Sequence, residues 1–183
     1  MYNKHKAAQL AAYFAKEEGG KINYMKLVKL MYLAERTVLL RDGYLMVADD
    51  LYFLPHGPIL SRSLDMMRYP HSSEDEWTAL FNDAVKYDIS LKTTHLSRDD
   101  FDHLSDREIA VADEIWNEFK LYDQFRLEAY THELPEWNNP GAGRLPISIK
   151  EMAHRFGLSI EAATELENQV RTDAYIDGLF VSA

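Results

Sequence analysis

The chain has 183 residues, of which 46% are hydrophobic and 27% charged, a composition typical of one folded domain and not of a disordered chain. It contains no cysteine, which excludes disulfides, thiolate metal sites and cysteine nucleophiles and indicates a reducing, cytoplasmic location. No apolar run reaches the roughly 18 residues that a membrane-spanning helix needs, so we expect no membrane partner.

The formal charge of −10 is concentrated in the middle of the chain. Residues 1–48 carry eight Lys and Arg against four Asp and Glu, whereas residues 49–137 carry eight against twenty. An acidic surface repels a phosphate backbone, so nucleic acid is a disfavoured partner. The same charge suits a basic protein partner, and it also fits an ordinary solvated surface.

Helical spacing of apolar residues predicts a first helix over about 4–18, ended by Gly19-Gly20. Asn23 is a suitable N-cap for a second helix over 23–42, whose apolar side chains cover most of its circumference. A helix of this kind is buried in the middle of a fold, so we expect it to be the central core helix.

The next segment combines a strand with a turn. LYFL at 51–54 has strand composition, and Pro58 fits the first turn of a helix that continues to about Arg68. The alternating stretch at 87–94 predicts a short strand that pairs with LYFL.

The remaining elements are predicted to be helical. Serine-to-glutamate spacings of the capping-box type occur three times, at Ser73–Glu76, Ser105–Glu108 and Ser148–Glu151. The first of these predicts a helix over about 74–84, and apolar periodicity predicts helices over 106–119 and 122–133, packed as a hairpin. The turn-rich stretch 138–146 is a linker signal, and two short helices follow it.

These elements predict a mostly α fold: a compact helical domain with a short two-stranded β element and a small C-terminal helical pair. We place the main domain at 1–140 and a C-terminal helical extension, packed on the same domain, at 141–183.

No catalytic or metal-binding motif is present. The histidines lack HExxH or HxH spacing, and the chain has no GxSxG elbow, P-loop or calcium loop. We therefore expect a protein that is not an enzyme, with no catalytic residues, no metal and no cofactor. The enzymatic alternative is a hydrolase built around His56 and the carboxylates of residues 49–50.

Residues 148–172 have the outline of a helix-turn-helix, which raises the alternative of a DNA-binding autoregulator. Its second helix, however, carries Glu161, Glu165 and Glu167 and no basic residue before Arg171. These acids would meet phosphate with repulsion, so a packed helical pair is the favoured interpretation.

The stretch His56-Gly57-Pro58 places a histidine beside a backbone that bends freely at the glycine and is fixed at the proline. It follows the strand that carries Tyr52. Such a segment is either a contact site or a bend that shapes a surface.

A second feature is His132, at the end of a helix where the dipole favours a cation, followed by Trp137 after a proline turn. The third is a basic stripe of Lys26, Lys29 and Arg36 on the otherwise apolar second helix. The stripe is either a secondary binding surface or a set of lysines that snorkel to water.

Three segments together resemble one family. They are KLVKLMYLAERTVLLRDGYLMVADDLYFLPHGPILSRSL, LSDREIAVADEIWNEF and YTHELPEW. Their order and spacing resemble the Panacea domain of the SocA-like antitoxin family, over about residues 5–140. The resemblance implies a mostly helical antitoxin of a prokaryotic or phage toxin–antitoxin pair, which neutralises a cognate toxin, encoded by the adjacent gene, by direct protein binding.

The resemblance leaves the mechanism open, because such antitoxins accompany unrelated toxins. The protein either blocks its toxin directly or acts as a proteolytic adaptor that delivers the toxin to a cytosolic protease. On this interpretation the toxin-binding or shape-setting residues are Tyr52, His56, Gly57, Pro58, His132 and Trp137, with Lys26, Lys29 and Arg36 as a secondary surface.

Overall fold

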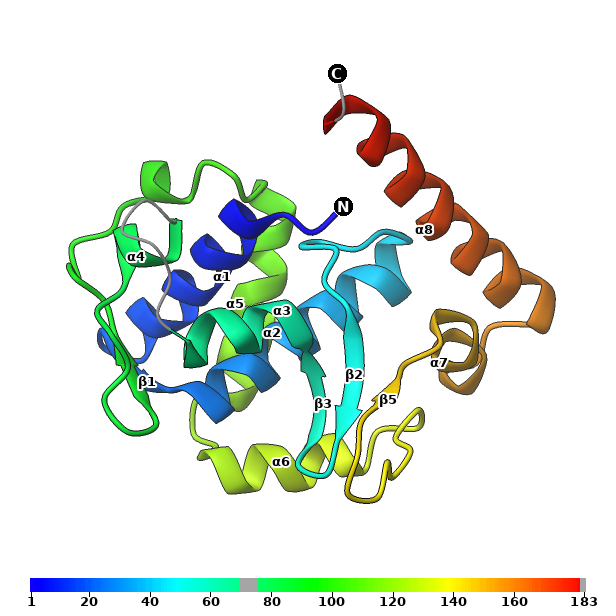
Figure 1. Ribbon diagram of the computed structural model, residues 1–183, viewed down its shortest axis with the longest axis horizontal. Helices are drawn as coiled ribbons and strands as arrows, with labels where there is room; N and C mark the ends of the chain where they lie inside the picture. The colour runs from blue at the N-terminus through cyan, green and yellow to red at the C-terminus, as the bar shows by residue number, and fades with distance from the viewer. Residues whose placement is uncertain (70–75, 182–183) are drawn as a thin grey trace.

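The computed structural model describes residues 1–69 and 76–181, with side chains up to Leu179. The helices are α1 (Lys4–Glu17), α2 (Tyr24–Asp42), α3 (Ser61–Arg68), α4 (Glu76–Leu80), η1 (Arg98–Phe101, a 3₁₀ helix), α5 (Asp106–Phe119), α6 (Gln124–His132), α7 (Ile149–Phe156) and α8 (Ile160–Val181). The strands are β1 (Lys21–Asn23), β2 (Leu51–Leu54), β3 (Gly57–Leu60), β4 (Asp88–Ser90) and β5 (Leu145–Pro146). The predicted mostly helical fold is confirmed (Figure 1).

Helix α2 is the centre of the fold, as its apolar circumference predicts. It packs against α1, α5, α6 and the β3 strand, and Tyr32 in its middle is completely buried. Asn23 caps its start, where its side chain accepts a hydrogen bond from the Met25 N–H at 3.0 Å. Gly43, at φ +82°, ends it in the left-handed conformation that favours glycine.

The strands form two small sheets, and one predicted pairing is wrong. β2 lies between β3 and β5, whereas β4 pairs with β1 near the start of α2. The LYFL strand therefore does not pair with the strand at 88–90. Its main partner is the segment that follows it, because a tight turn at Pro55-His56 lets the two strands meet with little loss of loop entropy.

The start of α3 also differs from the prediction. Pro58 lies in β3 opposite Phe53, and the helix begins three residues later at Ser61. The preceding residue, Leu60, offers no side-chain cap. The buried carboxylate of Asp49 replaces it, accepting hydrogen bonds from the Arg62 N–H at 2.9 Å and from the Ser63 N–H at 2.8 Å.

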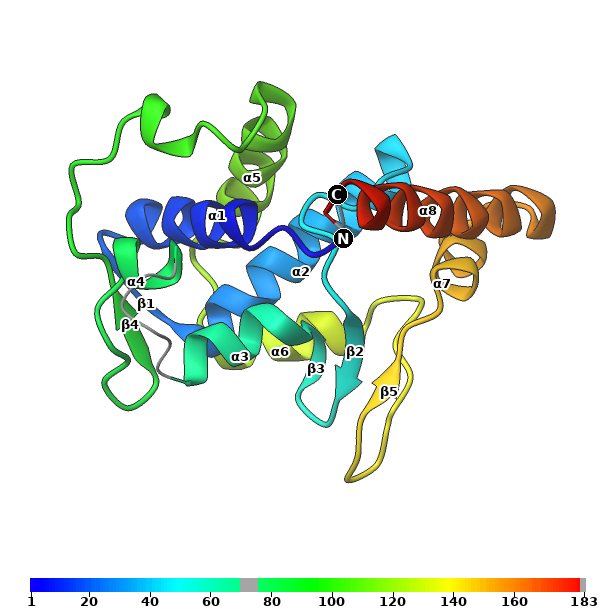
Figure 2. The same ribbon diagram turned by 45° about the horizontal axis from the view of Figure 1, so that its top comes forward.

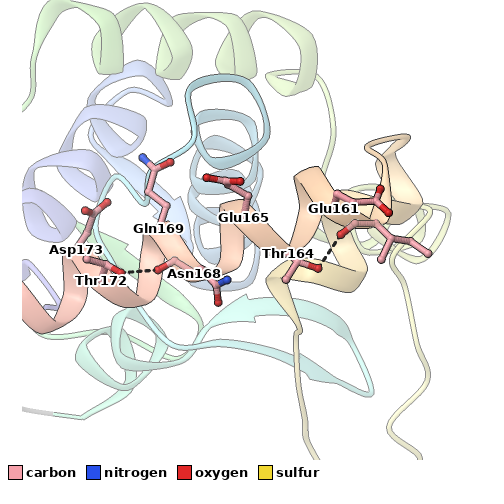
Figure 3. Close-up of a pocket in the computed structure, with 8 residues that line it drawn as sticks. Glu161, Thr164, Glu165, Asn168, Gln169, Thr172 and Asp173 are labelled. Carbon is pink, nitrogen blue, oxygen red and sulfur yellow. Dashed lines mark hydrogen bonds between the residues drawn. The ribbon is translucent and has the colours of Figure 1, made fainter.

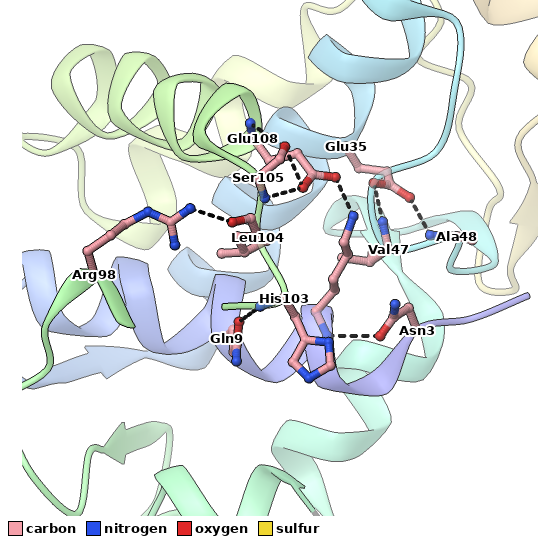
Figure 4. A network of polar contacts seen from close by, with 11 residues as sticks. Asn3, Gln9, Glu35, Val47, Ala48, Arg98, His103, Leu104, Ser105 and Glu108 are labelled. Carbon is pink, nitrogen blue, oxygen red and sulfur yellow. Dashed lines mark hydrogen bonds and ion pairs between the residues drawn. The ribbon is translucent and has the colours of Figure 1, made fainter. Parts of the chain in front are cut away.

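Two of the three predicted serine caps can be tested. Ser105 and Glu108 form the reciprocal capping box at the start of α5 (Figure 4). Ser148 accepts a hydrogen bond from the Glu151 N–H at 3.1 Å at the start of α7. The spacing that begins at Ser73 lies outside the described residues.

Helices α5 and α6 follow each other in sequence and both pack on α2. They contact each other mainly through three aromatic rings. Phe119 meets Tyr122 and Tyr130, with ring centroids 5.3 and 4.7 Å apart. Both helices pack along α2, so α2 and not a separate hairpin is their common support.

A buried carboxylate fastens the segment between α2 and β2. Glu35 is fully buried and accepts hydrogen bonds from the N–H groups of Val47 and Ala48, each at 3.0 Å (Figure 4). Burial raises the pKa of Glu35 to about 7, against the opposing effect of these backbone donors. The α2 helix thereby fixes the backbone that leads into β2.

The C-terminal segment continues from the β2–β3–β5 sheet into two helices. Gly157, at φ +118°, ends α7, and Ser159 accepts a hydrogen bond from the Ala162 N–H at 3.2 Å as α8 begins. The prediction of two short helices is wrong for α8, which has 22 residues and extends beyond α7 (Figure 2). In the part of the chain that the structure describes, no helix is long and apolar enough to cross a membrane.

The cap that Asp49 supplies can be tested by replacing this residue with alanine. Asp49→Ala leaves buried donors at the start of α3 without an acceptor, which costs about 1–3 kcal/mol. We expect the melting temperature to fall by about 3–10 °C. The matched control is Asp50→Ala, because Asp50 is exposed and its carboxylate pairs with the exposed Arg62 side chain. Equal melting of the two variants would contradict the assignment.

Candidate functional site

The β2–β3 hairpin brings the predicted site residues into one region. Its turn, Pro55-His56, is followed by Gly57 at φ +97°, a conformation that favours glycine. β3 packs on both α2 and α6. Segments that are about 75 residues apart in sequence, the HGP stretch and the HELPEW stretch, therefore lie against each other.

Lys29 of α2 holds the hairpin from inside the protein. Its side chain is buried, and Nζ donates a hydrogen bond to the Pro58 carbonyl oxygen at 2.9 Å. A Cβ atom at Gly57 would lie 2.6 Å from this Nζ and 2.7 Å from Thr131 Oγ1. Gly57 is thus required both by its backbone conformation and by the space that Lys29 occupies.

Burial also sets the charge of this region. Desolvation lowers the pKa of Lys29 to about 7, although the nearby Glu128 carboxylate favours the protonated amine. The pKa of His132 is lowered as well, chiefly by desolvation. Its Nε2 atom is buried and has no hydrogen-bond partner among the described residues.

The HELPEW stretch packs its rings on the hairpin. His132 stacks on Trp137 with ring centroids 4.2 Å apart and planes inclined by 18°. Trp137 in turn meets Phe53 of β2 edge to face, at 5.2 Å. We call Lys29, Gly57, Pro58, His132 and Trp137 the junction cluster, because they join β2–β3, α2 and the end of α6.

Glu136, inside the same stretch, pairs with α2. Its buried carboxylate accepts hydrogen bonds from Arg36 Nε at 2.5 Å, from the Arg36 terminal nitrogen at 3.0 Å and from the Tyr32 hydroxyl at 3.1 Å. Two parallel bonds between a guanidinium and a carboxylate are strong and directional. The pair fixes the segment after α6 to the central helix.

The prediction of a basic surface stripe on α2 is therefore wrong. Lys26 and Lys29 are 4% and 1% exposed, and Arg36 is mostly buried against Glu136. Lys26 lies away from the junction cluster, where it pairs with Glu18 at 2.6 Å and lies over the Trp116 ring. The cations are buried because each finds a carboxylate or carbonyl partner on a neighbouring element.

Two predicted residues reach the surface. The His56 side chain is 69% exposed, and its Nδ1 lies 2.9 Å from a Glu128 carboxylate oxygen. The ring of Tyr52 is covered by the Arg144 guanidinium, 4.6 Å from the ring centroid. His56 and the carboxylates of residues 49–50 lie at opposite ends of β2, so the hydrolase site considered from the sequence is not assembled.

His56 stands at the edge of a groove of about 530 Å³ between the hairpin, α3, α6 and the start of α2. We call it the apolar groove. It is lined mainly by Tyr24, Met25, Leu54, Ile59, Leu64 and Phe125. Tyr87 and Phe125 border it with 63% and 69% of their surface exposed. The groove therefore combines an apolar floor with two large aromatic side chains exposed at its border.

Sequence reasoning missed the partners that organise the site. Glu128, Thr131 and Glu136 were within or next to a quoted motif, but only the fold shows what they contact. Glu136, between Pro135 and Trp137, was a usable signal of a buried ion pair, since a carboxylate next to a tryptophan can face a buried cation. The groove itself left no pattern in the sequence, because its walls come from five separate segments.

The described residues contain no group of three or more His, Asp or Glu side chains that could hold a metal ion. The two basic groups whose pKa values are lowered chiefly by desolvation, Lys29 and His132, lie beside the hairpin and support it.

A family model described as antitoxin SocA-like, Panacea domain, matches residues 27–138. The match covers more than half of the chain, so the chain belongs to the SocA-like antitoxin family, as the resemblance indicated. The match begins in α2 and ends just after Trp137, and it therefore contains the whole junction cluster. Comparison with curated proteins and with solved structures finds no match.

Replacing Gly57 by alanine tests the packing at the hairpin. Gly57→Ala adds a methyl group against Lys29 and Thr131 and strains the backbone. The control is Gly19→Ala, because Gly19 has nearly the same φ, +95°, with nothing within 4 Å of the added atom. We expect Gly57→Ala to melt about 5 °C or more below the control. Equal melting temperatures would show that the packing is not tight.

The lowered pKa of Lys29 predicts a pH dependence of stability. Between pH 7 and 9 the unfolded chain keeps the Lys29 proton and the folded chain does not, so the free energy of unfolding rises with pH. In the wild type we expect this rise to be on the order of 1 kcal/mol per pH unit, and we expect Lys29→Met to lack it. The control Lys21→Met, at an exposed lysine, keeps the wild-type slope. Parallel curves for wild type and Lys29→Met would contradict this assignment.

Proposed function

We propose that this antitoxin-family protein neutralises a cognate toxin by direct binding, and that the apolar groove receives the toxin. The observation that carries the proposal is the groove bordered by exposed Tyr87 and Phe125, beside His56 of the family motif. Exposed aromatic residues over an apolar floor are the usual centre of a protein interface, since their burial contributes much of the binding free energy.

The junction cluster has a supporting role in this proposal. Lys29 and Gly57 fix the hairpin turn, and the turn positions Leu54 and His56 at the groove. A platform that is rigid before binding loses little conformational entropy when its partner docks. The motif residues are thus mainly shape-setting, and the groove residues make the contacts.

Binding alone is sufficient for neutralisation by blockade, and we propose this mechanism. The measurement that separates it from delivery to a protease is the half-life of the toxin in cells with and without this protein. An unchanged half-life supports blockade, whereas a shortened half-life supports the adaptor mechanism.

The toxin candidate is the product of the adjacent gene. Expressed alone it should arrest growth, and co-expression of this protein should restore growth. The double variant Tyr87→Ser, Phe125→Ser should weaken binding of the purified pair by about 10- to 100-fold, measured by calorimetry, with reduced rescue. These residues are exposed, so the variant keeps its fold.

The control for this experiment is Phe156→Ser, at an exposed ring of α7 outside the groove. It should bind and rescue like the wild type. An adjacent gene without toxicity, or toxicity that this protein does not relieve, would refute the proposed function. Rescue that persists in the groove variant would refute the groove as the toxin site.

A further inference from the structure

Helix α8 lies outside the family match, and only its first half has buried side chains. Its buried side chains are Ala163, Leu166 and Val170, all in its first half and on one face. Residues 171–177 are all exposed. The second half of α8 therefore buries none of its described side chains, although Asp177 pairs with the N-terminal amine at 2.8 Å and the end of the helix lies near the N-terminus (Figures 1 and 2).

This half of α8 still carries large apolar side chains on its surface. Tyr175, Ile176 and Leu179 are 69%, 44% and 55% exposed, and their spacing places them near one another along the helix. A helical segment this short is marginal in water by itself, because most helix stability comes from packing of an apolar face. Such a segment gains stability when a partner covers it.

The charge of α8 defines the chemistry of that partner. Residues 160–181 contain five acidic residues and one basic residue. Glu167 lies 3.4 Å from Arg171, and Asp177 lies 2.8 Å from the N-terminal amine. Among the described residues, Glu165 and Asp173 have no ion-pair partner, whereas a hydrogen bond with Ser159 and the charge of Lys150 act on Glu161 and lower its pKa.

The three acids follow one another along a shallow pocket on α8, together with the polar side chains of Asn168 and Thr172 (Figure 3). The spacing of four and eight residues keeps them on one side of the helix. A row of carboxylates repels the phosphates of nucleic acid and attracts lysine and arginine on a protein surface. The helix-turn-helix outline of this segment thus does not favour DNA.

We propose that α8 is a second toxin contact, which selects the particular toxin of this antitoxin. Its partner surface is an apolar depression, filled by Tyr175, Ile176 and Leu179, with lysine or arginine side chains beside it that pair with Glu165 and Asp173. The inference rests on the proposed function, because it takes the toxin as the occupant. It assigns specificity to a helix that the family match does not include.

The experiment measures binding of the purified adjacent-gene product to the full chain by calorimetry at two salt concentrations. One variant, Glu165→Lys with Asp173→Lys, reverses the charge; the other, Tyr175→Ser with Ile176→Ser and Leu179→Ser, removes the apolar contacts. Each should weaken binding about tenfold or more. The charge variant should also lose the weakening by salt that wild-type binding shows.

The matched control is Asp99→Lys with Glu118→Lys, which makes the same change in net charge at exposed acids of other elements. It should bind like the wild type. Melting temperatures equal to that of the wild type show that each variant is folded, and the charge variant alone tests the inference if the apolar variant does not fold.

Three outcomes would overturn the inference. If the wild type binds and both α8 variants bind equally well, α8 is not a toxin contact, and the proposed function stands. If the wild type is a dimer that the apolar variant converts to a monomer without loss of toxin binding, a second copy covers α8. If the wild type neither binds nor rescues, the proposed function fails, and this inference fails with it.

Discussion

The arrangement of the surface depends on one buried interaction, the hydrogen bond from Lys29 Nζ to the Pro58 carbonyl oxygen. An amine in this position is costly to bury, as its lowered pKa shows, and its hydrogen bond to the backbone carbonyl offsets part of that cost. Gly57 leaves the space through which the amine reaches the carbonyl. Because the hairpin turn follows from this contact, so does the position of the groove wall that the hairpin forms.

The same design recurs along α2. Glu35 binds the backbone of residues 47–48, Arg36 binds Glu136, and Lys29 binds the hairpin. Each polar group lies in a helix that is otherwise apolar, and each fastens a neighbouring segment to it: the stretch before β2, the segment after α6, or the start of β3. Unpaired polar groups would be strongly destabilising at these positions, so the network favours one arrangement of the loops over alternatives of similar apolar burial.

The parts of the fold that sequence could predict are those with local signals. The central helix, its Asn23 cap, the Ser105 capping box and the LYFL strand depend on neighbours in sequence, and the structure has them. The wrong predictions concern long-range geometry. These wrong predictions depend on what packs against each segment, which the periodicity of apolar residues does not encode. They are the strand partner of LYFL, the start of α3, and the exposure of Lys26 and Lys29.

The proposed division of contacts follows from where the family match ends. The junction cluster and the hairpin lie within it, so a groove held by these residues is a property that family members can share. Helix α8 lies outside, carries free acids and apolar side chains, and is attached through α7 and β5 to the edge of β2. A contact on this appendage can change its charge and apolar pattern without disturbing Lys29 or Gly57. An antitoxin built in this way can keep one fold and one groove while its terminal helix changes to fit different toxins.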